Sequence, residues 1–230
     1  MKSKPVKTTG CNLVQSSDFG FENIVNPRNI GFQWEEILYR PSFTTDISVY
    51  FRSMNAKDKV NFDFKTIECL VEISKNKPGV KLSVNISPVS LTSESFMFFL
   101  LKKIQTNQLN PRQICLEIVE DEPIPKLPFK ILNVIKLLRN LGVWVALDDF
   151  GNGFAHWELL KNDLIDVLKI VNNNVNKSQF ETLSTDCYLI GLLEFAKTQR
   201  ISTVIEGIEC EDDYLKGQSL GFDFFQGYYL

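Results

Sequence analysis

The sequence predicts a parallel α/β fold, and two observations carry that prediction. From about residue 79 onward, short runs rich in Val, Ile, Leu and Phe alternate with longer stretches that have the spacing of amphipathic helices. The short runs seldom alternate with polar residues, which is typical of strands buried on both faces of a parallel sheet. This alternation of strand and helix suits either a closed barrel or an open doubly wound sheet.

The first third of the chain is less regular. Residues 1–20 show no periodicity, and we expect them to form a loose arm. Residues 21–25 and 32–39 have the composition of strands, and the turn-rich segment 26–29 (Asn-Pro-Arg-Asn) joins them. Strands with so short a link must be antiparallel neighbours. We expect residues 21–230 to form a single domain.

The remaining elements follow in chain order. Residues 131–141 carry apolar side chains at spacings of three and four, and Gly142 follows where such a helix would end. Residues 93–106 and 185–200 are two further stretches of helical length. The remaining predicted strands are residues 80–86, 114–118, 143–147, 167–170, 202–205 and 222–225.

Composition excludes several classes of function. The 230 residues include one histidine, His156, which excludes zinc sites built on paired histidines. A formal net charge of −3 argues against a surface for nucleic-acid polymers. The five cysteines are scattered without a CxxC pair, and the longest apolar run, of six residues, is too short to cross a bilayer. We therefore expect a cytoplasmic domain without disulfides and without a membrane span.

Polar side chains recur at the carboxyl ends of the predicted strands. Any one of them alone is explained as the N-cap of the next helix, but caps do not require acids on strand after strand. In a parallel barrel these strand ends form the rim where active sites are built. The residues are Asn85, Glu117, Asp148, Asp149, Lys169, Glu206 and Gln226, and Glu36 lies within the second strand.

The adjacent pair Asp148 and Asp149 indicates a cation site. Two neighbouring carboxylates repel unless a cation lies between them. Oxygen ligands without histidine suit hard ions such as Mg²⁺ or Mn²⁺. One shared Asp would bridge two ions, as in two-metal phosphoryl transfer, and Lys169 would then stabilise phosphate charge or orient a water.

These residues lie in seven motifs that resemble the EAL domain family, the cyclic di-GMP phosphodiesterases. The segment Glu-Ile-Leu-Tyr-Arg at residues 36–40 is similar to the signature Glu-Ala-Leu-Leu-Arg of that family. The resemblance extends from about Phe21 to Leu230, and seven ordered motifs are far more specific than any one. The other six lie at residues 83–87, 116–120, 148–153, 169–170, 206–209 and 226–228.

The resemblance implies a TIM-type (β/α)8 barrel with an antiparallel first strand. It also implies hydrolysis of cyclic di-GMP to linear pGpG with two Mg²⁺ or Mn²⁺ ions per site, in a homodimer. A regulatory domain or protein partner would lie outside this chain. The metal ligands it implies are Glu36, Asn85, Glu117, Asp148, Asp149 and Glu206. The catalytic residues are Lys169, Glu206 and Glu209, the substrate contacts are Arg40 and Gln226, and Glu120 supports the loop after Asp149.

Several positions depart from the family pattern. Ile37 replaces the signature alanine, which would tighten packing beneath the metal, and Val171 replaces an Asp after the Lys-Ile pair. The loop after Asp149 is altered at Asn152, Ala155 and His156, and Val119 replaces a Thr. These changes leave open a weakened domain that acts as a cyclic di-GMP receptor or a protein-interaction module. A cysteine hydrolase with His156 as its base is a third alternative. The chain ends just after its last predicted strand, where the family usually continues into a closing helix.

Overall fold

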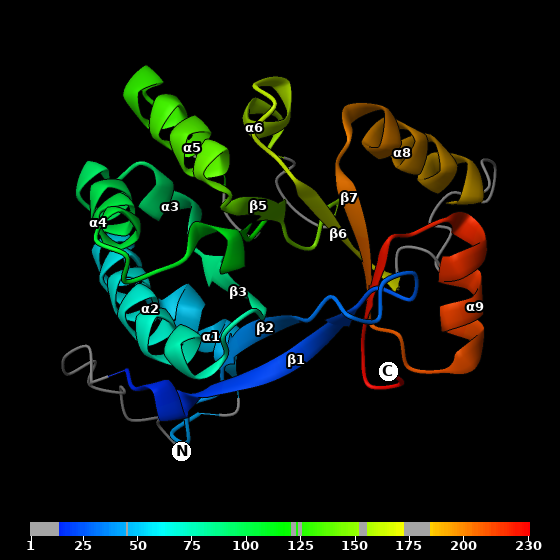
Figure 1. The fold of residues 1–230 in the computed structure, drawn as a ribbon, viewed down its shortest axis with the longest axis horizontal. Helices are drawn as coiled ribbons and strands as arrows, with labels where there is room; N and C mark the ends of the chain where they lie inside the picture. The colour runs from blue at the N-terminus through cyan, green and yellow to red at the C-terminus, as the bar shows by residue number, and fades with distance from the viewer. Residues whose placement is uncertain (1–13, 45, 121–122, 124–125, 152–155, 173–184) are drawn as a thin grey trace, which may run out of the picture.

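The computed structural model describes residues 14–44, 46–120, 123, 126–151, 156–172 and 185–230. Within them the chain forms a closed barrel of eight strands in sequential order, with helices on the outside (Figure 1). The predicted α/β fold is confirmed, and of its two forms the closed barrel is the one observed. Asn152 and Ala155, two of the altered loop positions, lie outside the described residues.

The strand directions are also as predicted. β1 is antiparallel to both of its neighbours, β2 and β8, and every other neighbouring pair is parallel. The strands are β1 (Phe19–Val25), β2 (Trp34–Tyr39), β3 (Lys81–Ile86), β4 (Ile114–Ile118), β5 (Trp144–Leu147), β6 (Val167–Val171), β7 (Ser202–Glu206) and β8 (Phe224–Gln226).

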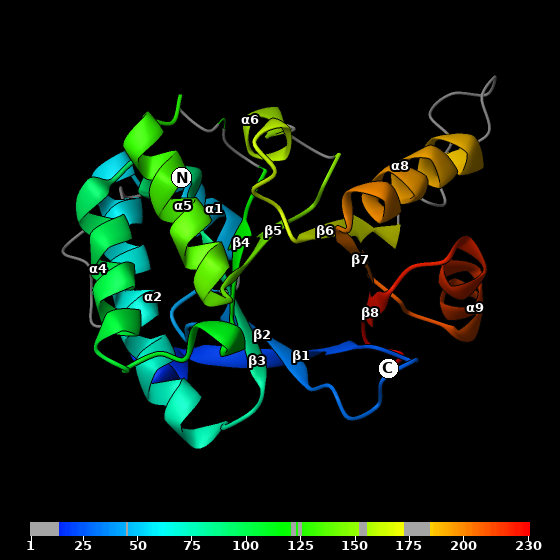
Figure 2. The ribbon, with the colours of Figure 1, turned by 45° about the horizontal axis from the view of Figure 1, so that its top comes forward.

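The helices surround the strands. In the two ribbon views α2, α4 and α5 lie side by side along one part of the barrel, and α8 and α9 cover another part (Figure 2). Among the described residues no helix has both the length and the apolar character needed to cross a lipid bilayer. The helices are α1 (Ile47–Ser53), α2 (Ala56–Asn76), α3 (Pro88–Leu91), α4 (Glu94–Gln105), α5 (Phe129–Leu141), α6 (Trp157–Lys161), α8 (Thr185–Gln199) and α9 (Glu211–Leu220), with 3₁₀ turns at Ser16–Asp18 and Pro111–Gln113.

The alternation of side chains along each strand separates two apolar layers. The outer layer lies between the strands and the helices and forms the main core. The inner layer fills the amino-terminal end of the barrel, where the ring of Trp34 lies 5.5 Å from that of Trp144 and 5.1 Å from that of Phe224. Above these rings Trp34 Nε1 donates a hydrogen bond to Ser83 Oγ (3.1 Å). The amino-terminal end is therefore packed, and the inward acids and amides that contact Lys169 and Glu36 lie toward the other end.

Some strand boundaries and one packing expectation differ from the sequence-based prediction. β1 begins at Phe19, two residues before the expected strand, and β8 begins at Phe224, two residues after it. Ile37 belongs to the outer layer, on the opposite face of β2 from Glu36. The expectation that Ile37 tightens packing beneath the metal is therefore wrong, because successive side chains of a strand point to opposite faces.

Candidate active site at the carboxyl ends of the strands

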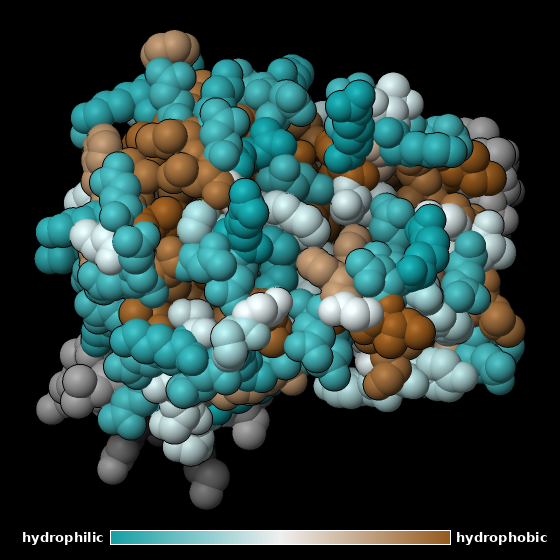
Figure 3. Space-filling view, in the orientation of Figure 1, coloured by the Kyte–Doolittle hydropathy of each residue, from teal (hydrophilic) through white to brown (hydrophobic). Residues whose placement is uncertain are grey.

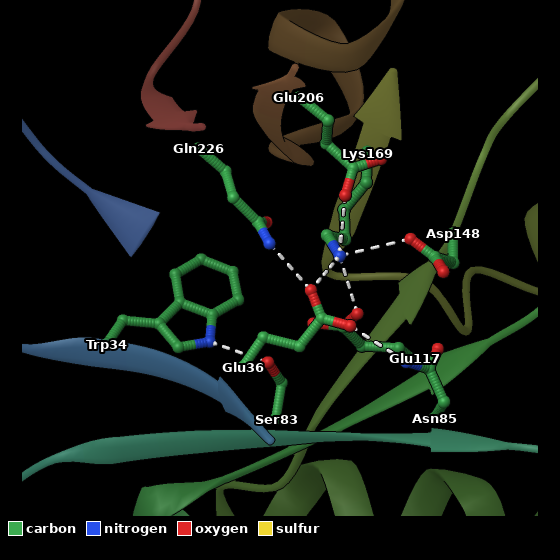
Figure 4. Close-up of polar contacts among 9 residues, drawn as sticks. All are labelled: Trp34, Glu36, Ser83, Asn85, Glu117, Asp148, Lys169, Glu206 and Gln226. Atoms are coloured by element: carbon green, nitrogen blue, oxygen red, sulfur yellow. Dashed lines mark hydrogen bonds and ion pairs between the residues drawn. The ribbon is translucent and has the colours of Figure 1, made fainter. Parts of the chain in front are cut away.

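The polar residues of seven consecutive strands converge inside the carboxyl end of the barrel. Each points inward, and most lie at or just after the end of their strands, while Glu36 and Lys169 lie within β2 and β6; the strands share one direction and one side-chain alternation. Figure 4 shows that they point toward one another, from β2 round to β8. The cluster consists of Glu36, Asn85, Glu117, Asp148, Lys169, Glu206 and Gln226.

Lys169 lies at the centre of this cluster. Its side chain is fully buried, and its Nζ is 2.6 Å from Glu117 Oε2 and 3.0 Å from Glu36 Oε2. The same atom is 2.8 Å from Glu206 Oε1 and 3.0 Å from Asp148 Oδ1 (Figure 4). An ammonium has three N–H donors, so these four carboxylates share them.

Two amide side chains complete the cluster. Asn85 Nδ2 donates to Glu36 Oε1 (2.8 Å), and Gln226 Nε2 donates to Glu36 Oε2 (2.7 Å). Each amide therefore turns its carbonyl oxygen away from Glu36. Asn85 Oδ1, Gln226 Oε1 and Glu117 Oε1 are buried oxygen atoms without a hydrogen-bond partner. Such orphan acceptors are rare in native proteins and are typical of sites that bind an ion, a water or a ligand.

Burial and mutual repulsion shift the pKa values of the acids. Burial raises the pKa of Glu117 well above its usual range, and the charge of Glu36 adds to this. Burial raises the pKa of Asp148 to about 6 and that of Glu206 to about 8. Burial acts in the same direction on Glu36, but Lys169 and the two amides outweigh it and lower the pKa of this carboxyl. One ammonium therefore does not offset the burial and mutual repulsion of Glu117, Asp148 and Glu206.

The donor set fits a hard divalent cation. It consists of carboxylate and amide oxygens, which Mg²⁺ and Mn²⁺ prefer, and three of these oxygens have no partner. As the side chains stand, however, no group of three His, Cys, Asp or Glu residues within the described residues is spaced to hold a metal ion. Lys169 Nζ takes the position between the carboxylates.

The surroundings expected to hold a second ion lie beside Asp148 and Glu206. Asp149 is exposed and has a left-handed backbone (φ 54°), and its charge helps to raise the pKa of Asp148. Val171 pairs with Glu206 across β6 and β7, so the replacement of an Asp at this position removes a carboxylate next to Glu206. Glu120 Oε2 accepts a hydrogen bond from the backbone N–H of Gly151 (3.0 Å), in the loop after Asp149.

His156 lies outside the cluster. Its side chain is buried, and Nε2 is 3.0 Å from the carbonyl oxygen of Val119, so the histidine ties its loop to the end of β4. Cys115, two residues before Glu117, is fully buried in the inner layer of the barrel. Burial raises the pKa of its thiol well above the usual range, which is the opposite of what a nucleophilic cysteine needs.

Two further predicted site residues lie at the edge. Arg40 is exposed and lines a pocket of about 350 Å³, which also reaches Asn85, Asp148 and Asp149. Glu209 is exposed on the loop after β7, where its backbone N–H donates to Asp213 Oδ2 (3.2 Å). The structure therefore brings Arg40 to the mouth of the site but leaves Glu209 outside the cluster.

Sequence reasoning missed Asp63 on α2. Its buried Oδ2 accepts hydrogen bonds from the Ser90 hydroxyl (2.6 Å) and the Ser87 backbone N–H (3.0 Å). It thereby fixes the segment that follows Asn85. The sequence offers no signal for this role, because an acid within a helix is ordinarily a solvent-exposed residue.

The chain is similar in sequence to bacterial proteins that act on cyclic di-GMP. It is 33% identical over 160 residues to the probable cyclic di-GMP phosphodiesterase PdeN of Escherichia coli (strain K12), covering 69% of this chain and 30% of PdeN. It is 32% identical over 161 residues to the cyclic di-GMP phosphodiesterase PdeA of Borreliella burgdorferi, covering 68% of this chain and 23% of that protein.

A third relative has a regulatory name. The blue light- and temperature-regulated antirepressor BluF of Escherichia coli is 31% identical over 150 residues, covering 64% of this chain and 36% of BluF. The chain therefore spans at most 36% of the length of these three relatives.

Solved EAL structures have the same fold. A standalone EAL protein from Vibrio cholerae with c-di-GMP bound aligns with a TM-score of 0.75 and 21% identity, over 92% of this chain and 89% of that one. Klebsiella pneumoniae BlrP1, in its manganese and cy-diGMP complex, aligns with a TM-score of 0.73 and 24% identity, over 92% of this chain and 54% of BlrP1.

The family sequence model described as the EAL domain matches residues 60–230, which is more than half of the chain. The matched range begins after β2, so the place of Glu36 in the cluster comes from the structure. The chain belongs to the EAL domain family.

Proposed function

We propose that this chain is a metal-dependent phosphodiesterase that hydrolyses cyclic di-GMP to linear pGpG. The observation that supports the proposal most is the inward cluster with its three unpartnered oxygens, Asn85 Oδ1, Glu117 Oε1 and Gln226 Oε1. A purely structural role does not require buried acceptors without donors, whereas a cation site does. Relatives named as cyclic di-GMP phosphodiesterases supply the substrate class.

The proposed division of ligands follows the positions in the cluster. Two bound Mg²⁺ or Mn²⁺ ions would polarise the phosphoryl oxygens and generate a nucleophile from water near neutral pH. In this proposal Asp148 is shared between the two ions. The first ion would be held by Glu36, Asn85, Glu117 and Asp148, and the second by Asp148, Asp149 and Glu206.

The remaining residues position the reactants. Glu206, at the carboxyl end of β7, would take a proton from the attacking water. Lys169 would orient that water or stabilise the phosphate charge, and Arg40 at the mouth of the 350 Å³ pocket would contact a phosphate. Gln226 holds Glu36 in place, and Glu120 holds the backbone of Gly151. Glu209, exposed outside the cluster, is at most an accessory to the water.

The test is turnover of cyclic di-GMP with Mg²⁺ or Mn²⁺, comparing Glu36→Gln with Glu35→Gln. The two positions are adjacent, but Glu35 points out of the barrel and pairs with Lys77. We expect Glu36→Gln to lower pGpG formation at least about 100-fold and Glu35→Gln to leave it within a few fold. EDTA should abolish the wild-type activity. Equal turnover by the wild type and Glu36→Gln would refute the proposal.

Val171 favours a second candidate, a receptor that binds cyclic di-GMP without hydrolysing it. The residue puts an apolar side chain beside Glu206 on the proposed second-ion side. Calorimetric titration separates the two functions, since a receptor binds the dinucleotide tightly without producing pGpG. Absence of binding in a folded protein favours a protein-interaction domain, the role suggested by the antirepressor relative.

We also propose that the domain forms a homodimer through the side of the barrel that bears α5. Phe129 and Leu137 of α5 and Phe98 of α4 are exposed, and Figure 3 shows apolar side chains at the surface between these two helices. Light scattering on the purified chain measures the oligomeric state, and Leu137→Lys is expected to give a monomer.

A further inference from the structure

The charged groups that contact Lys169 are all acids. Four carboxylates, from Glu36, Glu117, Asp148 and Glu206, lie within 2.6–3.0 Å of one ammonium, and the lysine side chain has no exposed surface. Carboxylates at this spacing repel one another strongly when buried, and a positive charge between them offsets that repulsion. At the position of Lys169, a single cation thus meets all four acids.

Burial of a lysine does not by itself produce this arrangement. Lys81 is also buried inside the barrel, at its amino-terminal end. Its Nζ donates to the carbonyl oxygen of Arg112 (2.8 Å) and lies 3.9 Å from the centre of the Trp144 ring. Lys81 therefore has neutral contact partners, whereas all four ion-pair partners of Lys169 are acids.

The oxygens that Lys169 contacts belong to the proposed metal ligands. Its Nζ contacts Oε2 of Glu36, Oε2 of Glu117 and Oδ1 of Asp148. The other Glu117 oxygen, Oε1, has no partner. A divalent cation bound by these acids would lie close to the ammonium, and two positive charges a few ångströms apart repel each other.

We propose that Lys169 is an internal counter-cation, which holds the four acids together when no divalent ion is bound and competes with that ion for them. This inference rests on the proposed metal site and adds to it a determinant of metal affinity. Binding of the ion then requires Lys169 Nζ to give up part of its contacts. Its long flexible side chain allows this without a change in the barrel. Lys169 therefore stabilises the metal-free site and at the same time lowers the affinity of the site for the divalent ion.

Lys169→Met tests the proposal, with Lys81→Met as the matched control. Both changes replace a buried ammonium by an apolar chain of similar length, but only the first removes charge from the acids. In EDTA we expect the melting temperature of Lys169→Met to fall by about 10 °C or more below that of Lys81→Met. Mn²⁺ should raise the melting temperature of Lys169→Met more than that of the wild type. By calorimetric titration Lys169→Met should bind Mn²⁺ about tenfold or more tightly, and Lys81→Met like the wild type.

A second variant covers the case in which Lys169→Met fails to fold in EDTA. Adding Glu117→Gln removes one negative charge, so the double variant should regain most of the lost stability. The proposal is overturned if the double variant is no more stable than Lys169→Met, or if Lys169→Met binds Mn²⁺ more weakly than the wild type. Failure of the proposed function has a different signature: the wild type binds no divalent ion, while the melting temperatures in EDTA still differ as expected.

Discussion

At the scale of single residues, the candidate site depends on a buried acid that lies outside the cluster. Asp63 accepts hydrogen bonds from Ser87 and Ser90 and so fixes the chain just after Asn85. Burial raises its pKa to about 7, and the two hydrogen bonds and the nearby charge of Lys59 offset only part of that effect. Asp63 thus holds its proton more firmly in the folded protein than in the unfolded chain.

Asp63→Asn should therefore change how stability depends on pH. Between the unfolded pKa of 3.8 and the folded pKa of about 7, the unfolded chain releases this proton first, so the wild type loses stability as the pH rises. Asn cannot titrate, so the variant lacks this loss. Between pH 4 and pH 8, the free energy of unfolding of Asp63→Asn should rise by up to roughly 4 kcal/mol relative to that of the wild type. Denaturant unfolding from pH 4 to pH 8 measures the difference.

The control for this change lies on the same helix. Glu68 is exposed on α2, and Glu68→Gln should follow the wild type at every pH. A constant offset between Asp63→Asn and the wild type across the whole range would mean that Asp63 titrates normally.

The shared direction of the parallel strands decided which site residues could be predicted from the sequence. The cluster followed from the sequence, because parallel strands carry residues such as Glu117 and Lys169 to one rim. The sequence could not place the ammonium of Lys169 among four acids, because that depends on distances across the barrel. Asp63 was missed because only the packing of α2 against the segment after β3 buries it.

At the scale of elements, α2 is the longest of the described helices that the sequence analysis did not anticipate. Its buried positions follow helical spacing, but polar residues interrupt them, among them Lys59, Asp63 and Thr66. A stripe interrupted in this way does not have the apolar periodicity of an ordinary core helix. The polar residues on the buried face of α2 line the pocket beside the candidate site, which explains why the apolar pattern of this helix is weak.

The contact between α9 and the barrel is set by one small residue, Gly217. A Cβ added there would lie 2.8 Å from Phe225 Cε1 and 3.2 Å from Ile205 Cγ2, both in the packed outer layer. We expect Gly217→Ala to destabilise the protein by about 1–2 kcal/mol, because overpacking outweighs the gain in helix propensity.

Gly191 in α8 is the matched control for this substitution. It also lies within a helix, but its added Cβ would meet no atom within 4 Å. Gly191→Ala should therefore stabilise the protein by about 0.5–1 kcal/mol. Opposite signs for the two variants in urea unfolding support the close packing of α9. If both variants changed the free energy of unfolding in the same direction, helix propensity rather than packing would decide the effect at both positions.

At the scale of the whole molecule, the site exists only because the barrel closes. Strand β8 pairs with β7 on one side and, antiparallel, with β1 on the other, where Ile24 lies opposite Gln226. This closure joins the two ends of the described chain and carries Gln226 to Glu36 on β2. Contacts so distant in sequence form late and slowly in folding, so the completed cluster depends on the most non-local pairing of the fold.

Gly227, directly after β8, tests this dependence. It has φ 153°, and an added Cβ would lie 2.3 Å from both the nitrogen and the oxygen of Ile208. Gly227→Ala must therefore separate these backbones and strain the hydrogen bond from the Ile208 N–H to the Gln226 carbonyl (3.0 Å). We expect a loss of about 3 kcal/mol or more in the free energy of unfolding.

Gly221 provides the control for backbone conformation alone. Its φ is 93°, but an added Cβ would meet no atom within 4 Å, so Gly221→Ala should cost only about 1 kcal/mol. Because Gly227→Ala also displaces Gln226 from Glu36, it should lower cyclic di-GMP turnover in protein that is still folded, whereas Gly221→Ala should not. Equal stability and equal turnover of the two variants would mean that the site tolerates an open barrel, contrary to the contacts that join β8 to β2 through Gln226.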